Sequence, residues 1–248
     1  GNGTDATSVN ALETLREELV PQTIGSVDGA DAYVTGLTAG SEDFDAQMTK
    51  TAPIVFAFVL GLAFILLMVT FRSIVIPLKA IVLNLLSVGA AYGVLVLVFQ
   101  DGHGESLLGF ESTGAITAWL PLFLFVLLFG LSMDYHVFIL SRIREAFDGG
   151  MSTDDAISHG IKSTAGVVTS AAVVMVAVFA VFATLSALDF KQMGVGLAVA
   201  VLIDATIVRG VLLPASMKLL GDRNWYLPNW LGWLPKAGRE PEVQGARA

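Results

Sequence analysis

An acid and a phenol stand side by side, Asp134 and Tyr135, inside an apolar stretch that runs from residue 119 to residue 140. Placing an ionisable carboxyl in the hydrocarbon of a membrane costs roughly 2.5 to 3.5 kcal/mol on insertion scales, and such residues mark proton or ion paths. A tyrosine hydroxyl donates a hydrogen bond to a carboxylate or accepts one from the protonated acid. The pair therefore predicts a proton relay.

The geometry of a helix separates the two side chains. Adjacent residues on a helix point about 100° apart, so Tyr135 serves a carboxyl on a neighbouring helix more easily than it serves Asp134. This predicts a second acid elsewhere. The alternative is that Asp134 only bonds a serine or the backbone and fixes helix packing.

Two more charged residues, Asp204 and Arg209, lie within an apolar run. Five residues rotate by about 140° on an α-helix, whereas a spacing of three or four would align the two side chains. A salt bridge that holds helices together is one interpretation of these two residues. The alternative is that each finds its own partner on another helix. Arg209 is also near enough to the end of its run to extend toward the membrane surface.

His136 and Ser132 flank the acid and phenol pair. A histidine exchanges a proton near neutral pH and could tune a proton path, whereas the alternative is an imidazole that packs in the protein or faces the cytoplasm. Ser132, His136, Asp204 and Arg209 are the candidates for a supporting role. No metal site or catalytic residue is predicted.

The composition is that of an integral membrane protein, with 54% hydrophobic and 15% charged residues. The predicted fold class is mainly α, a polytopic bundle of five spans near the length of about 20 residues that crosses the hydrocarbon core. The predicted spans are 52–71, 77–99, 117–140, 164–187 and 191–220. A bend is expected at Pro214.

Basic residues lie on alternate sides of these spans. The richer side holds Arg72, Lys79, Arg142, Arg144, Lys162, Lys218, Arg223, Lys236, Arg239 and Arg247, and the opposite short loops hold only Lys191. Positive residues concentrate in cytoplasmic loops. We predict a multi-pass protein of the plasma (inner) membrane, with its N-terminal segment extracytoplasmic and its C-terminus cytoplasmic.

The first 50 residues carry most of the net charge of −8, because nine acidic residues stand there against Arg16 and Lys50. The elements predicted in them are a helix over 11–19, a short strand over 32–36 and a helix over 41–48. One helix and one strand bury no core alone. We expect residues 1–50 to be the end of an α+β extracytoplasmic domain of a longer protein.

Two connecting segments remain outside the spans. The Gly-rich loop over 100–114 is expected to pack at the interface, and the alternative is a substrate gate. The segment 221–248 contains four aromatic residues, Trp225, Tyr226, Trp230 and Trp233. They predict an anchor at the cytoplasmic membrane interface, and a tail is expected after it.

The motif Phe129-Gly-Leu-Ser-Met-Asp134-Tyr135 and its continuation to Glu145 resemble the signature of the MMPL branch of the resistance-nodulation-division transporters. The resemblance continues from Asp204 through Arg209 to Pro214 and covers residues 30 to 233. His136 departs from the pattern, because an acidic residue often follows the pair in the family.

The resemblance implies a proton-motive-force-driven exporter of lipids or other hydrophobic molecules. The five spans resemble spans 8 to 12 of such transporters, and residues 1–50 resemble the close of the second porter domain. In the family, an Asp–Tyr pair on span 10 faces an equivalent pair on span 4. Asp134 and Tyr135 match the span 10 pair, so the implied partner is the N-terminal half of the same transporter.

Other functions remain open at this point. A nontransporting scaffold or lipid-binding half that organises envelope-synthesis partners is the alternative, and a matching Asp–Tyr pair upstream would favour transport. A hydrolase is disfavoured because the sequence has no Gly-x-Ser-x-Gly elbow, no His-Glu-x-x-His pair and no cysteine. We expect no enzyme activity, no cofactor beyond the proton gradient and no nucleic-acid partner. The expected contacts are with the lipid bilayer, and a homo-oligomer is one possible assembly.

Overall fold

The computed structural model describes residues 5–234, and the chain divides into two compact units, Gly1–Phe56 and Ala57–Ala248. Helices make up most of both units, and no strand forms within the described range. The predicted mainly α bundle of membrane-spanning helices is thus confirmed, whereas the predicted tail over 235–248 lies outside the described residues.

The first unit consists of a succession of short helical segments followed by the start of a long helix. Helix α1 (Ala6–Thr14) begins where the Asp5 carboxylate accepts a hydrogen bond of 2.8 Å from the backbone N–H of Ser8. A π-helical turn (Leu15–Leu19), α2 (Val20–Gln22) and a 3₁₀ turn (Ile24–Ser26) follow. Helix α3 (Leu37–Phe71) then begins in this unit.

The strand predicted over 32–36 is wrong, because residues 31–35 have no regular secondary structure. A strand needs a neighbouring strand to take up its backbone hydrogen bonds, and the described residues offer none. The segment is held instead by Arg16, which donates to the backbone carbonyl of Val34 at 3.2 Å and forms a two-bond ion pair with Asp43 at 2.6 and 2.7 Å.

The second unit contains the remaining helices. They are α4 (Val75–Leu95) with a π-helical turn (Val96–Gln100), α5 (Glu105–Leu108), α6 (Leu120–Asp148), α7 (Thr153–Phe182), α8 (Leu188–Ile203), a π-helical stretch (Asp204–Leu212), α9 (Leu213–Leu220), and 3₁₀ turns (Gly221–Trp225 and Asn229–Leu231). Pro214 lies in the first turn of α9, directly after the π-helical stretch.

Five helices are long and apolar enough to cross a membrane, and each contains the greater part of one predicted span. They are Leu37–Phe71, Val75–Gln100, Leu120–Asp148, Thr153–Phe182 and Leu188–Trp225. Helix α7 begins well before its predicted span, at Thr153, because Ser152 caps it by accepting a hydrogen bond of 3.2 Å from the N–H of Asp155. The protein is therefore a multi-pass membrane protein.

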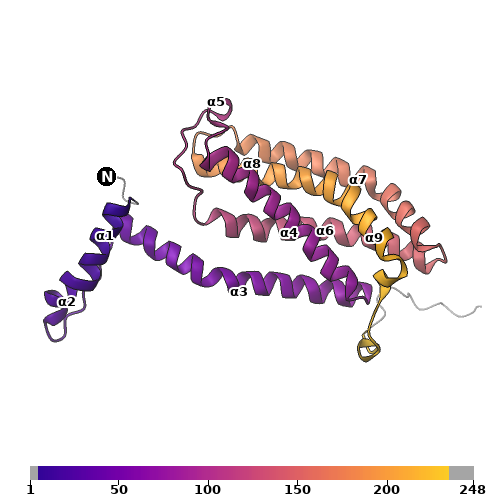
Figure 1. Ribbon diagram of the computed structural model, residues 1–248, viewed down its shortest axis with the longest axis horizontal. Helices are drawn as coiled ribbons and strands as arrows, with labels where there is room; N and C mark the ends of the chain where they lie inside the picture. Colours follow the sequence, from indigo (N-terminus) through magenta and orange to yellow (C-terminus); the bar gives the residue numbers. More distant parts are fainter. Residues whose placement is uncertain (1–4, 235–248) are drawn as a thin grey trace, which may run out of the picture. The chain divides into compact units, whose positions relative to one another are not determined.

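Helices α4, α6, α7 and α8 run alongside one another in the second unit (Figure 1). Two glycines allow the closest approaches. A Cβ on Gly160 of α7 would come within 2.3 Å of Ile143 on α6, and a Cβ on Gly194 of α8 would come within 2.7 Å of the backbone oxygen of Phe179 on α7. Small residues at such positions let membrane helices pack with their backbones close together.

The outer face of α7 is apolar and open. Its valines at 167, 173, 174, 178 and 181 are all more than half exposed. The small residues Ala165, Gly166 and Ser170 are exposed on the same helix. In a membrane this surface faces either lipid or further helices.

Candidate functional site

The charged pair at the centre of the bundle is Asp204 with Arg209, and the two side chains meet directly. Arg209 donates from Nε to the Asp204 Oδ2 atom at 2.9 Å and makes a second, shorter bond to the same oxygen through Nη2. Only 3% of the Arg209 side chain and 11% of the Asp204 side chain are exposed. The predicted salt bridge thus forms, but within one helical stretch, and both side chains also bond Ser132 of another helix. The expectation that Arg209 extends to the surface is wrong.

The backbone explains this pairing. Asp204 and Arg209 lie in the π-helical stretch Asp204–Leu212, whose hydrogen bonds join residues five apart. Residues five apart therefore lie one above the other, which an α-helix would not allow. The argument that a spacing of five residues disfavours a pair within one helix failed because it assumed an α-helix, and this segment is a π-helix, which is wider.

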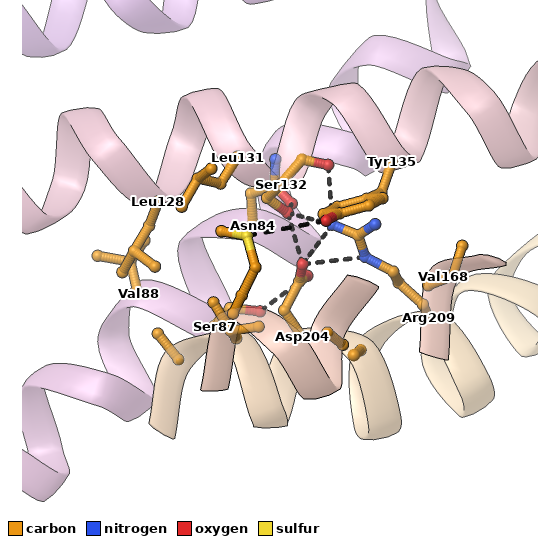
Figure 2. Close-up of a pocket in the computed structure, with 15 residues that line it drawn as sticks. Asn84, Ser87, Val88, Leu128, Leu131, Ser132, Tyr135, Val168, Asp204 and Arg209 are labelled. Atoms are coloured by element: carbon orange, nitrogen blue, oxygen red, sulfur yellow. Dashed lines mark hydrogen bonds and ion pairs between the residues drawn. The ribbon is translucent and has the colours of Figure 1, made fainter. Parts of the chain in front are cut away.

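Ser132 of α6 connects this ion pair to the neighbouring helix (Figure 2). Its hydroxyl lies 2.9 Å from Asp204 Oδ2 and 2.7 Å from Asn84 Oδ1, and it donates to one of these oxygens at a time. Arg209 donates to the Ser132 carbonyl oxygen at 2.8 Å and to its hydroxyl at 3.0 Å. Ser87 lies 3.4 Å from the other carboxylate oxygen.

Asn84 and Ser87 were not among the predicted site residues. Both are buried on α4, at 1% and 4% exposure. A signal was present, because Asn84 is an amide inside the apolar run 77–99, but a lone polar residue in such a run also serves helix packing. Their spacing of three residues places both on one helix face.

Tyr135 lies on the other side of Arg209. The guanidinium carbon is 4.7 Å from the centre of the phenol ring, a cation–π arrangement, and the Tyr135 hydroxyl contacts the Met175 sulfur on α7 at 3.9 Å. Tyr135 lines a pocket together with Ser132, Asp204 and Arg209 (Figure 2).

Asp134 lies on a different face of α6. It is exposed, does not line that pocket, and makes no hydrogen bond or ion pair with any residue in 5–234. The structure thus agrees with the expected angular separation of Asp134 and Tyr135. It brings Ser132, Tyr135, Asp204 and Arg209 together and leaves Asp134 apart.

His136 is fully buried, with 0% exposure. Neither ring nitrogen has a hydrogen-bond partner within the described part of the chain. Arg209, Asp204 and Lys79 lie near enough to act on the imidazole electrostatically. The packed position agrees with one of the two expectations for this residue, and the cytoplasm-facing position is wrong.

The segment after α9 folds back onto the bundle through Asn224. This residue is fully buried, donates to the carbonyl oxygens of Met217 and Gly221 at 2.7 and 2.6 Å, and accepts a hydrogen bond of 3.0 Å from Lys79. Arg72 donates to the Leu234 carbonyl at 2.7 Å. The end of the last span is therefore tied to the turn between α3 and α4.

The aromatic residues of this segment divide into two kinds. Trp225 stacks on Phe147 with ring centres 5.0 Å apart and lies 4.8 Å from the Arg144 guanidinium, so it packs within the protein. Tyr226, Trp230 and Trp233 are 56%, 74% and 76% exposed. Those three have the exposure that an interfacial anchor requires, and Trp225 does not.

The loop between α4 and α6 packs on the start of α8, in line with the first of the two expectations for it. The Lys191 amine donates to the Leu108 carbonyl oxygen, and Thr117 binds Gln192 at 3.0 Å and Asp189 at 2.9 Å. No group of three or more histidine, cysteine or acidic residues that could hold a metal occurs in residues 5–234.

Comparison with known proteins shows extensive similarity. The model of the MMPL family matches residues 1–240. The chain is 44% identical over 227 residues to the "Mycolic acid-containing lipids exporter MmpL11" of Mycolicibacterium smegmatis, a match that covers 92% of this chain and 23% of that protein.

Two further relatives carry different names. The chain is 41% identical over 225 residues to the "Heme uptake protein MmpL11" of Mycobacterium tuberculosis, with 91% of this chain and 23% of that protein covered. It is 35% identical over 203 residues to the "Trehalose monomycolate exporter MmpL3" of Mycolicibacterium smegmatis, with 82% and 20% covered. The chain thus spans less than a quarter of the length of these relatives.

Proposed function

Because the chain belongs to the MMPL family, we propose that it is the C-terminal membrane domain of a proton-motive-force-driven exporter of lipids or other hydrophobic molecules. Its five apolar helices and its match over residues 1–240 support a membrane transporter. The relatives are named for mycolic acid-containing lipids, heme and trehalose monomycolate, which share a large apolar part. The proposed substrates are therefore defined only as molecules with a large apolar part.

The observation that carries the proton coupling is the exposure of Asp134 on a membrane-spanning helix. A carboxyl that faces lipid is costly, so this face of α6 requires cover from polar protein groups. The relatives are more than four times as long as the matched segment, so a second half is available in proteins of this family. We propose that a matching Asp–Tyr pair of the N-terminal half covers Asp134.

The neighbouring surface suits such a partner. An open groove beside Tyr135 is lined by Gly166, Ser170, Ala171 and Met175 of α7. Small residues permit another helix to approach closely. In this arrangement Asp134 binds a proton that arrives from the extracytoplasmic side, and the Tyr135 hydroxyl donates a hydrogen bond to the carboxyl of the partner half.

The proposed orientation follows from the charges. Arg72, Lys79, Arg144 and Lys218 lie at or near the helix ends that carry the α3–α4 turn, the α6–α7 turn and the C-terminal segment. These ends are therefore proposed to be cytoplasmic, and the first unit extracytoplasmic. Asp204 and Arg209 hold the relay helix α6 in place through Ser132 and the Tyr135 ring.

The test uses the full-length protein in liposomes with an imposed proton gradient. Proton entry is followed with an internal pH dye, and export is followed with a fluorescent phosphatidylethanolamine as the probe. Asp134→Asn is expected to abolish gradient-driven export, and Asp154→Asn, a change in an exposed acid at the start of α7, is expected to leave it unchanged. Intact export by Asp134→Asn would show that the relay assignment is wrong.

A further inference from the structure

Several buried polar atoms of the second unit have no hydrogen-bond partner in the described part of the chain. They belong to four residues: Asn84 Nδ2, both ring nitrogens of His136, Arg209 Nη1 and Trp225 Nε1. A buried polar group that lacks a hydrogen-bond partner destabilises the fold. A cluster of such groups is therefore explained by bound water or by a role in function.

These atoms follow the same helix interface. Tyr92 of α4 bonds Pro121 of α6, and Asn84 of α4 bonds Ser132 of α6. The lower-numbered residue of α4 thus meets the higher-numbered residue of α6. The two helices are therefore antiparallel. His136 lies one helical turn beyond Ser132, about 6 Å along α6. It is therefore further toward the end of the bundle that holds the α3–α4 turn.

Lys79 lies at the matching level of α4. It precedes Asn84 by five residues, which is about 7.5 Å along that helix toward the same end. The charges that act on His136 come from both flanking elements, namely Arg209 and Asp204 of the π-helical stretch and Lys79 of α4. His136 thus stands between the ion pair and Lys79.

The row of polar groups continues to the end of the bundle. Lys79 is half-buried and donates to the Asn224 side chain at 3.0 Å, and Trp225, with its unpaired Nε1, follows directly. A core histidine with a purely structural role is normally bonded through at least one ring nitrogen. His136 has polar groups on both sides, and the Ser132 carbonyl acts on its imidazole, but neither ring nitrogen has a partner at hydrogen-bond geometry in the described residues.

We propose that His136 carries protons along an internal path between α4, α6 and the last span, from Asp204–Arg209 to Lys79–Asn224. Water bridges the unpaired atoms. One ring nitrogen accepts a proton from water on the Asp204 side, and the other ring nitrogen releases its proton to water on the Lys79 side. Turning of the ring or the reverse exchange restores the starting form, so no proton is gained or lost.

This inference rests on the proposed proton-coupled transport and assigns its exit path. Asp204 favours the transient imidazolium, whereas Arg209 and Lys79 oppose its persistence, so a proton passes and does not remain. A histidine suits this step because one ring nitrogen can accept a proton while the other donates one. Under the proposed orientation the path opens to the cytoplasm.

The activity test uses the same full-length protein in liposomes, with the pH dye and fluorescent phosphatidylethanolamine as probes. His136→Gln keeps a polar side chain but exchanges no proton. It is expected to slow proton entry by about 100-fold, the lower end of what a positioned acid–base group contributes, and to change the pH dependence of that rate. Tyr92→Phe, which removes a half-buried hydroxyl near the opposite end of α4, is expected to change neither measurement.

A second measurement does not depend on transport. In a cysteine-free full-length background, His136→Cys is expected to react with a small charged thiol reagent added from the side of the α3–α4 turn. Leu124→Cys is an equally buried position in the other half of α6 and is expected to remain unreactive. This measurement still decides the inference if His136→Gln fails to fold.

The outcomes separate the two proposals. If Asp134→Asn abolishes proton-driven export but His136→Gln leaves the rate and pH profile unchanged, the path through His136 is wrong and the proposed function stands. An unreactive His136→Cys overturns the path in the same way. Absence of proton-driven export by the unmodified protein overturns the proposed function and, with it, this inference.

Discussion

Asp204 and Arg209 form a buried ion pair within one helix although five residues separate them, with Arg209 Nε 2.9 Å from the Asp204 carboxylate. The π-helical stretch that aligns them is a rare backbone geometry, which is found mostly at functional sites. The ion pair and the backbone therefore stabilise each other. The same arginine also contacts the Tyr135 ring and bonds Ser132, both on α6, and Ser87 of α4 bonds Asp204, so three elements meet at this pair.

Arg209→Met should lower the free energy of unfolding by about 3–5 kcal/mol, because it leaves the buried Asp204 charge without its partner. The double change Asp204→Leu with Arg209→Met should recover most of that loss, since no isolated charge remains. Thermal unfolding in detergent, followed by tryptophan fluorescence, measures both. Arg142→Met is the matched control, because both side chains of the Arg142–Glu145 pair are exposed and the pair contributes little to the free energy of unfolding.

Tyr135→Phe should separate the stability of the site from its proton chemistry. The phenyl ring keeps the contact with the Arg209 guanidinium, so stability should be unchanged, whereas Tyr135→Leu should lose about 0.5–2 kcal/mol. Proton-driven export should fall in both variants because both lack the hydroxyl. Normal export by Tyr135→Phe would remove the tyrosine from the proposed relay.

Gly160→Ala and Gly194→Ala should each destabilise the bundle by about 1–3 kcal/mol, the usual range for overpacking. The new Cβ would meet Ile143 in the first case and the backbone of Phe179 and Ala183 in the second. Gly166→Ala is the control, because nothing in the described chain lies within 4 Å of its Cβ position. The unfolding midpoints of the three variants give the comparison, and equal midpoints would contradict the close helix contacts.

Asn224→Ala should destabilise the protein by about 1–3 kcal/mol, because the carbonyls of Met217 and Gly221 and the Lys79 amine lose their partner. Asn229→Ala, a change in an exposed residue of the same segment, should have little effect. Limited proteolysis of the C-terminal segment offers a direct readout, with faster cleavage expected for Asn224→Ala alone. Equal cleavage rates would show that Asn224 does not secure the segment.

Much of the fold followed from patterns that are local in the chain. The five spans were predictable because a helix that crosses hydrocarbon needs about 20 apolar residues, and such runs stand out in the sequence. The boundaries were less predictable, since polar residues such as Ser152 and Asp155 extend α7 beyond the apolar run. The strand over 32–36 failed because pairing depends on a neighbour and not on the segment itself.

The sequence by itself determined that the chain crosses a membrane, and it singled out Asp134, Tyr135, Asp204 and Arg209 as charged or hydroxyl groups within apolar runs. Only the tertiary structure decided how they combine. It widened the last span into a π-helix that pairs Asp204 with Arg209, placed Asn84 and Ser132 against them, buried His136 and left Asp134 exposed. The physical reason is that residue type alone shows which side chains need polar partners in an apolar run, whereas the partners depend on backbone geometry and on helices that are distant in the chain.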